Sequence, residues 1–546
     1  VYGDVMLNFN YNIRRFDIAA TLGWTGRYEN MNNMRVSTNG GLVTENWFDL
    51  NASRYTASST LQRMELLKTG YMGTLSLGWD NYLFLELTGR QERSSTLKDQ
   101  SFFYPSANLS FLFSNAFRMP AWWNHGKLRL SYGVVGNAPE TYAANIIYEQ
   151  GSDNGFTWNY VPSSWGNANI RPEKKYEYEI GFESKFLNNR LGFDVSYYNN
   201  RVKDQILSTP QPSTSGVKYV LMNVGEVANE GWDISVSATP VLTKNFRWDL
   251  TANYGIYRNK VVKLADGVPY LEISNIGGGG AKIQAVEGRP MGDIYVQVPQ
   301  MNENGEYLVS DKGLYMNQTE LQRVGNINPD GVGGLFSSFS YKNIFLDFSI
   351  DFRIGGDVIN EMYQYSTASG LTPESLQFRD TEHGGLSYYY PGNNNASGVP
   401  VQVDPSLSAG PNGETVYHDG VILPGVVAST GEKNTRIIPA GYYYNQTYNW
   451  GTQPEQLTYR HSVFDNSYVK LRELTIGYQF PEKLISKLGM TRLSVSVFGR
   501  NLFYFYKALK NYDAESSVGT SWASQAVVGG STTATRNFGV SLRASF

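Results

Sequence analysis

The sequence predicts an all-β fold, specifically a transmembrane antiparallel β-barrel, and three observations support this. Apolar and polar residues alternate over long segments, and short turns and long connections join these segments in turn. Aromatic residues are also abundant, with 39 tyrosines, 27 phenylalanines and 11 tryptophans among 546 residues. In a membrane barrel only every second residue faces lipid, so the mean hydropathy stays low, here -0.37.

The clearest alternation predicts a β-hairpin. In the segment 176–186 the even positions are mostly aromatic or aliphatic, and the odd positions between them are mostly charged. After Asn188 and Asn189 the parity changes, and the odd positions of 191–197 are apolar. Two alternating runs that are joined by turn-forming residues are typical of two paired strands.

The alternation in 344–354 predicts which face of the sheet each residue lies on. Its apolar even positions alternate with Asp347, Asp351 and Arg353. Full charges on one face suit a water-filled lumen, so we expect Ile350 to face lipid and Asp351 to face the lumen. A soluble β-sandwich is the alternative, but the predicted strands run to about 10–14 residues, above the ~5–6 of globular sheets.

The connections between the predicted strands are of two alternating kinds. The short ones lie near Arg14-Arg15, Asp80-Asn81, Asn188-Asn189, 243–245 and Lys342-Asn343, and 481–489 is expected to be a brief helical turn. The long ones span roughly 27–70, 137–174, 259–332, 356–465 and 506–534. Outer-membrane barrels combine short periplasmic turns with long extracellular loops, whereas loops above ~12–15 residues are unusual in soluble domains.

The pattern predicts fifteen strands. They start near residues 5, 16, 71, 82, 106, 127, 175, 191, 219, 246, 333, 344, 467, 491 and 535. Single-chain bacterial barrels have even strand counts, so we expect further strands upstream of Val1. On this interpretation residues 1–546 are the C-terminal portion of one barrel domain.

Several classes of function are disfavoured by composition. The net charge of -3 gives no reason to expect nucleic acid as a partner, and the absence of cysteine excludes disulfides and thiolate metal sites. His125, His383, His418 and His461 are scattered without ligand spacing, so no metal site is expected. No 18-residue apolar run predicts a transmembrane helix, and no spacing argues for catalytic residues or a cofactor.

Four segments have a distinctive sequence, namely 171–206 (RPEKKYEYEIGFESKFLNNRLGFDVSYYNNRVKDQI), 223–264, 325–358 and 467–507, which begins SYVKLRELTIGYQF. Taken together, these segments resemble the SusC/RagA-like TonB-dependent transporters of Bacteroidetes. Residues 1–170 match more loosely. The resemblance implies a 22-stranded barrel with an N-terminal plug, of which these would be the last fifteen strands, and long extracellular loops.

The resemblance also implies a function and partners. The expected function is import of oligosaccharides, or of oligopeptides, across the cell outer membrane. The TonB complex would supply the energy, a SusD-like lipoprotein would act as a lid, and no enzyme activity or cofactor is implied. Two alternatives remain open, namely a passive porin and a barrel-anchored adhesin or surface enzyme that works through 356–465.

Two sets of candidate site residues follow. Aromatic rings can stack on sugars or hold peptides, although packing between loops is the simpler role for any one of them. The candidate ligand-binding residues are Trp158, Tyr160, Trp165, Tyr388, Tyr389, Tyr390, Tyr442, Tyr443, Tyr444 and Trp450. The alternating C-terminal strand that ends on an aromatic residue is similar to the assembly signal of outer-membrane barrels, and an ordinary edge strand is its alternative. The signal residues would be Phe538, Val540, Leu542 and Phe546.

Overall fold

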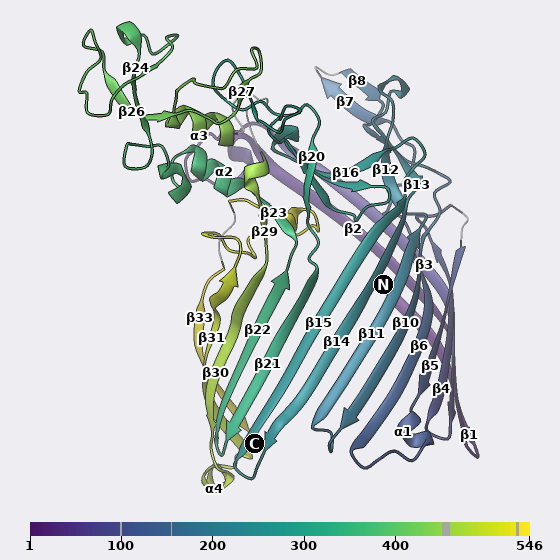
Figure 1. Cartoon of the computed structure of the whole chain (residues 1–546). Helices are drawn as coiled ribbons and strands as arrows, with labels where there is room; N and C mark the ends of the chain where they lie inside the picture. Colours follow the sequence, from purple (N-terminus) through teal and green to yellow (C-terminus); the bar gives the residue numbers. More distant parts are fainter. Residues whose placement is uncertain (99–100, 154–155, 450–458, 531–533) are drawn as a thin grey trace. The chain divides into compact units, whose positions relative to one another are not determined.

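A computed structural model of the chain describes residues 1–98, 101–153, 156–449, 459–530 and 534–546. Within this part, fifteen strands form one large antiparallel sheet in which each strand pairs with its neighbours along the chain, apart from small inserted elements (Figure 1). The predicted all-β fold and the number of strands are therefore confirmed. The strands of this sheet are β1 (Tyr2–Ile13), β2 (Phe16–Leu42), β3 (Ser53–Trp79), β4 (Leu83–Ser94), β5 (Ser101–Phe111), β6 (Trp123–Asn137), β10 (Glu173–Phe186), β11 (Leu191–Lys203), β14 (Glu226–Leu242), β15 (Phe246–Lys263), β21 (Gly331–Tyr341), β22 (Ile344–Ile354), β30 (Tyr468–Gln479), β31 (Arg492–Lys507) and β33 (Asn537–Ser545).

Smaller elements lie in the connections between these strands. The strands among them are β7 (Glu149–Asp153), β8 (Phe156–Tyr160), β9 (Ser164–Trp165), β12 (Ile206–Pro210), β13 (Tyr219–Asn223), β16 (Tyr270–Ile276), β17 (Ala281–Val286), β18 (Asp293–Val296), β19 (Leu308–Val309), β20 (Gln322–Asn326), β23 (Asp357–Asn360), β24 (Leu386–Tyr389), β25 (Val401–Gln402), β26 (Val416–Val421), β27 (Val426–Val427), β28 (Ile438–Pro439), β29 (Val463–Asp465) and β32 (Val527–Val528). The helices are α1 (Phe113–Ala116), α2 (Glu361–Ala368), α3 (Ala440–Tyr448) and α4 (Glu482–Ile485).

The chain divides into two compact units. The first comprises Val1–Val236 with Val261–Val268, and the second comprises Ser237–Lys260 with Pro269–Phe546. In the first unit the expected hairpin of β10 and β11 is present, with Phe186 paired to Leu191. Asn188 and Asn189 have φ angles of 59° and 62°, in the left-handed region that asparagine tolerates better than most residues, and this explains the tight turn.

The long connection expected at 27–70 is wrong. β2 continues to Leu42 and β3 starts at Ser53, and their backbone ladder runs through pairs such as Arg35 with Thr60. In 28–42 and 53–67 apolar residues such as Met31, Met34 and Leu61 are scattered among polar ones on both faces, so this part of the sequence lacks regular alternation. Backbone hydrogen bonds do not depend on side-chain polarity, so the ladder continues where the pattern ends.

The strand expected from residue 219 also starts later. β13 belongs to a separate three-stranded sheet with β12 and β9, and β14 begins at Glu226. Between them Gly225 has a φ of 100°, a conformation that side-chain-bearing residues rarely adopt. The chain therefore turns at Gly225 before it enters the large sheet.

The long connections of the second unit are folded. One forms a four-stranded sheet in the order β16-β17-β18-β20, whose buried residues Ile283, Ile294 and Val296 pack in a common core with Tyr459. Another forms the sheet β25-β24-β26-β28 together with α2 and α3. The helical turn expected at 481–489 is confirmed by α4, and the segment ends at Gly489 with a φ of 71°. No helix of the described residues is long and apolar enough to cross a membrane.

Candidate functional site

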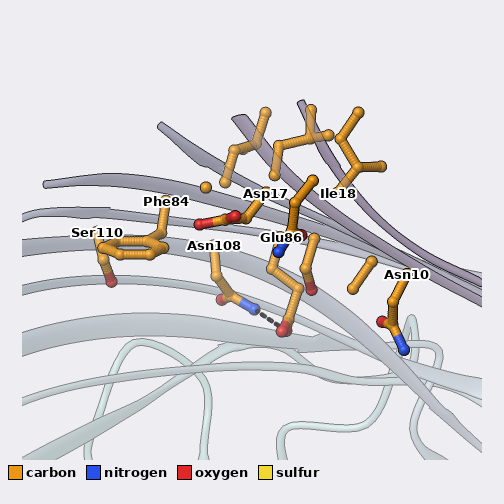
Figure 2. A pocket seen from close by; sticks show the side chains of 13 residues that line it. Asn10, Asp17, Ile18, Phe84, Glu86, Asn108 and Ser110 are labelled. Carbon is orange, nitrogen blue, oxygen red and sulfur yellow. Dashed lines mark hydrogen bonds between the residues drawn. The ribbon is translucent and has the colours of Figure 1, made fainter. Parts of the chain in front are cut away.

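A polar face runs across the strands of the first unit. Residues that are paired directly across antiparallel strands point to the same side of a sheet. One such row links Asn10, Ala19, Ser76, Glu86, Asn108, Ser131 and Glu179 through successive pairs. This row borders a cavity of about 640 Å³, which Figure 2 shows with the side chains that line it.

The charged residues that line this cavity are acidic. Asp17 and Glu86 line it, and the described residues around it include no lysine or arginine. Glu86 accepts a hydrogen bond of 3.3 Å from the side-chain amide of Asn108 (Figure 2). A face of carboxylates and amides is stable beside water and unsuited to lipid.

The second unit has a polar face of its own. There the row of paired residues is Asp249, Ser338, Asp347 and Thr475, and Ser338 donates a hydrogen bond of 2.6 Å to Asp347. A cavity of about 550 Å³ opens on this face. Its charged lining residues are Asp347, Glu473, Arg492, Arg500 and Arg543. Arg500 forms an ion pair of 2.8 Å with Glu473.

The opposite faces of the same strands are apolar. In the first unit one row of paired residues is Tyr11, Ile18, Leu77, Leu85, Leu109, Leu130, Ile180 and Tyr197. In the second unit a row is Trp248, Phe339, Leu346, Ile476, Val497 and Val540. Many of these side chains are exposed, Val540 by 70%, and continuous exposed apolar rows are what lipid would cover.

A charged cluster holds the connection between β31 and β33 against neighbouring strands. Lys470 Nζ lies 2.5 Å from Glu515 Oε2, and Arg472 also donates to Glu515 and to Asp351. Burial alone would raise the pKa of Glu515, but hydrogen bonds from Arg472 and Lys470 outweigh it and lower the pKa to about 2. Arg472 is the extra residue where the register between β22 and β30 shifts, so a β-bulge positions it for both carboxylates.

A second cluster fixes the four-stranded sheet of the second unit. The carboxylate of Asp293 is fully buried, forms ion pairs with Arg289 at 2.6 Å and Arg323 at 2.8 Å, and accepts a hydrogen bond of 2.9 Å from Asn326. Three donors satisfy this buried charge and join β18 to β20. Among the described residues no group of three or more histidines or carboxylates could hold a metal ion.

The structure places the predicted aromatic residues of 388–390 in a packed sheet. Tyr388 is 2% exposed, donates a hydrogen bond of 3.1 Å to Asp419 and stacks on Tyr417. Burial raises the pKa of its hydroxyl above the usual value. Tyr389 and Tyr390 are half-buried. This placement favours a packing role for Tyr388.

The tyrosines of α3 are also packed. Tyr444 is buried and donates a hydrogen bond of 2.8 Å to the backbone oxygen of Glu374. Tyr442 and Tyr443 are half-buried and pack against hydrophobic clusters of the same connection. Trp450 lies outside the described residues.

The remaining candidates lie in the first unit, and two of them are open to solvent. Trp158 and Tyr160 both project from β8 and are 48% and 44% exposed. Trp165 is half-buried on β9, and its ring meets Tyr148 edge to face. The structure thus brings Trp158 and Tyr160 onto one strand and gives Trp165 a packing partner.

The predicted assembly signal lies at the end of the large sheet. Phe538, Val540 and Leu542 alternate along β33 on its exposed apolar face, and Phe546 follows the strand. On its paired side β33 contacts β31, with Val540 opposite Val497. These positions are those expected from the alternation, and their role in assembly stays a prediction.

Sequence reasoning missed the groups that fix the connections. Glu515 and Asp293 lie in a segment without strand periodicity and in a short strand, and their partners Lys470 and Arg323 are distant in sequence. One signal was present, because β17 reads AKIQAV and β18 reads DIYV, both with alternating apolar residues. Alternating runs this short are also common in loops, so they do not by themselves predict strands.

An antiparallel sheet of this size, with a charged face, an exposed apolar face and long folded connections, defines the outer-membrane β-barrel class. The family model for TonB dependent receptor-like beta-barrels matches residues 2–294. The chain belongs to this family, and it is an outer-membrane protein.

Comparisons with individual proteins agree with this family. TonB-dependent receptor P3 of Formosa agariphila is 22% identical over 82% of this chain and 42% of that protein. TonB-dependent receptor SusC of Bacteroides thetaiotaomicron is 27% identical over 41% of this chain and 24% of that protein. The chain therefore spans less than half the length of these relatives, and their names are those of receptors rather than enzymes.

A solved structure shows the same fold. The structure of the RagAB peptide transporter matches with a TM-score of 0.73 and 18% sequence identity, over 100% of this chain and 56% of that chain. The expected resemblance to SusC/RagA-like proteins is thus confirmed.

Proposed function

We propose that this chain forms the barrel of an active importer that takes up oligosaccharides or oligopeptides, with energy from TonB and with a SusD-like surface lipoprotein as a lid. The observation that carries the proposal is that strands of both units combine a polar face with an exposed apolar face. Such a sheet separates water from lipid and can enclose an aqueous path. Family membership and the names of the relatives, SusC and the RagAB peptide transporter, favour import through that path.

The connections supply the cargo-contacting surface in this proposal. Exposed aromatic side chains on a supported strand offer a flat apolar face at small entropic cost, and Trp158 and Tyr160 on β8 have this arrangement. The buried Tyr388 and Tyr444 would stabilise the folded connections. The half-buried tyrosines beside them would make smaller contacts with the cargo.

Dependence of uptake on TonB tests the main claim. Cells that express the full-length protein should take up a labelled mixture of oligosaccharides and oligopeptides, and deletion of TonB should reduce this uptake to background. A passive porin would continue to admit the mixture without TonB, and that result would overturn the proposal. The amount of folded barrel is measured in both strains by the shift in gel mobility on heating.

A matched pair of tryptophan variants tests the role of β8. Trp158→Ala should lower uptake, because an exposed ring for stacking is lost, while the barrel stays folded. Trp122→Ala is the control, because Trp122 is also exposed but lies away from β8. Its ring stacks on Phe186, the last residue of β10 before the short turn to β11. Equal uptake by both variants would contradict a role for β8 in cargo contact.

The lid is tested by purification. The full-length protein, extracted from native membranes in a mild detergent, should bring down a lipoprotein encoded beside it. A barrel that repeatedly purifies alone from cells that make that lipoprotein would count against the partnership, even where uptake depends on TonB.

A further inference from the structure

A cavity of about 520 Å³ lies on one face of the four-stranded sheet β16-β17-β18-β20 in the second unit. Its floor is made of alternate residues of the two central strands, Lys282, Gln284 and Val286 from β17 and Tyr295 from β18. Lys282 and Tyr295 are paired directly across these strands. This volume lies within the ~300–1,000 Å³ of small-ligand sites.

The floor of the cavity is rigid. The residues between those of the floor, Ala281 and Ile283 on β17 and Ile294 and Val296 on β18, are fully buried in the hydrophobic core on the other face. At one end Asp293 is held by its arginine and asparagine donors. A site of this kind presents its polar groups in fixed positions before a ligand arrives.

The polar groups that face the cavity are largely uncharged. Gln284 is 5% exposed and lines the cavity, and no hydrogen bond of its side-chain amide is found among the described residues. Because Gln284 lines the cavity, its amide could donate hydrogen bonds to a ligand there and accept them from it. Tyr270 at the wall is 43% exposed, so its ring offers an apolar face beside that amide.

The charges around the cavity disfavour an anionic ligand. The ammonium group of Lys282 lies 2.7 Å from Glu272, which neutralises it. Glu320 also lines the cavity and is exposed. Lys282 and Glu320 are thus the charged residues that line the cavity, and because Glu272 pairs with the lysine, a carboxylate or sulfate on a ligand would find no unpaired cation among the described lining residues.

We propose that this cavity, here called the loop-sheet cavity, binds an uncharged, hydroxyl-rich segment of the cargo, that is, a neutral oligosaccharide. The amide of Gln284 would exchange hydrogen bonds with sugar hydroxyls, and Tyr270 and Tyr295 would contact the apolar face of a ring. This inference rests on the proposed import function and specifies the cargo class. The sheet precedes β21 in the chain and lies in one of the long connections.

The test uses the full-length protein, purified in detergent, on an array of defined probes. The array carries neutral oligosaccharides, oligosaccharides with uronic acid or sulfate groups, and unblocked peptides of a few residues. Wild type should bind neutral oligosaccharides, and Gln284→Leu should weaken this binding about tenfold or more, because the buried hydrogen-bond partner is lost while the shape is kept. Gln402→Leu, at an exposed position on β25 outside the cavity, should bind as wild type does.

A second variant tests the same cavity independently, in case Gln284→Leu does not fold. Tyr270→Leu removes the ring at the exposed wall without touching the core, and it should also weaken the binding of neutral oligosaccharides. Binding of neutral oligosaccharides that both variants retain would overturn the cavity assignment and leave the import function standing. Wild-type binding confined to peptides or acidic sugars would overturn the assigned cargo class. Wild type that binds no probe at all would count against the import function itself.

Discussion

Lys470 and Glu515 form an ion pair of 2.5 Å that joins a strand of the large sheet to the connection that follows β31. The lysine side chain is 2% exposed, and its ammonium group also lies 4.8 Å from the ring centre of Tyr504. Arg472 donates to the same carboxylate and to Asp351. One loop carboxylate thus compensates two cations that the sheet presents, and the connection 508–536 is held in place there.

Removal of the Glu515 charge should release that connection. Glu515→Gln leaves the buried Lys470 without an anionic partner, and the loss of one partner of a buried pair costs about 3–5 kcal/mol, less where water reaches the site as it does here. We expect a lower midpoint of unfolding in denaturant and faster proteolysis within 508–536. Glu482→Gln, at an exposed position on α4, is the control and should behave as wild type does. Equal stability of all three proteins would contradict the anchoring role.

The same carboxylate predicts a dependence on pH. The pKa of Glu515 falls from 4.5 to about 2 in the folded protein, so its contribution is fully present above about pH 4.5 and is lost as the pH falls through about 2. The stability difference between wild type and Glu515→Gln should therefore shrink between these two values. Denaturant midpoints measured at pH 6, 4, 3 and 2 give this difference. A constant difference over the whole range would contradict the assignment.

The two faces of β22 should respond differently to an added charge. Ile350→Arg places a cation on the apolar face and should cost about 2–4 kcal/mol near the middle of the bilayer. Ser349→Arg is the matched control, because Ser349 is paired with Glu473 on the polar face and can accept a cation. Asp351→Arg is less suitable, since it would face Arg472. The folded fraction on a gel, with and without heating, should drop for Ile350→Arg alone.

The C-terminal aromatic residue should matter for assembly more than for folding. Deletion of Phe546 removes an exposed residue beyond β33 that makes no ladder pair, so refolding in detergent should be unchanged. In cells the variant should reach the outer membrane in smaller amounts if Phe546 is part of the assembly signal. Normal membrane levels would indicate an ordinary edge strand instead.

Much of the large sheet could be predicted from the sequence. The apolar positions of 176–186 and 191–197 place β10 and β11, and the asparagines between them place the turn, because side-chain alternation and turn preference are local properties. The same argument fails for 28–42 and 53–70. There apolar residues are scattered on both faces of β2 and β3 without regular alternation, and only the backbone ladder shows that these segments are strands.

The sequence by itself thus determined the strands that separate lipid from water, since each of their residues must suit one of two solvents. Only the tertiary structure decided the roles of residues in the connections. Tyr388 and Trp158 are both aromatic residues of the connections. Tyr388 is buried and stacks on Tyr417, whereas Trp158 is exposed to solvent. Arg323 and Lys470, which pair with Asp293 and Glu515, likewise come from other segments. Burial in a folded connection depends on contacts between residues far apart in the chain, and local periodicity carries no record of them.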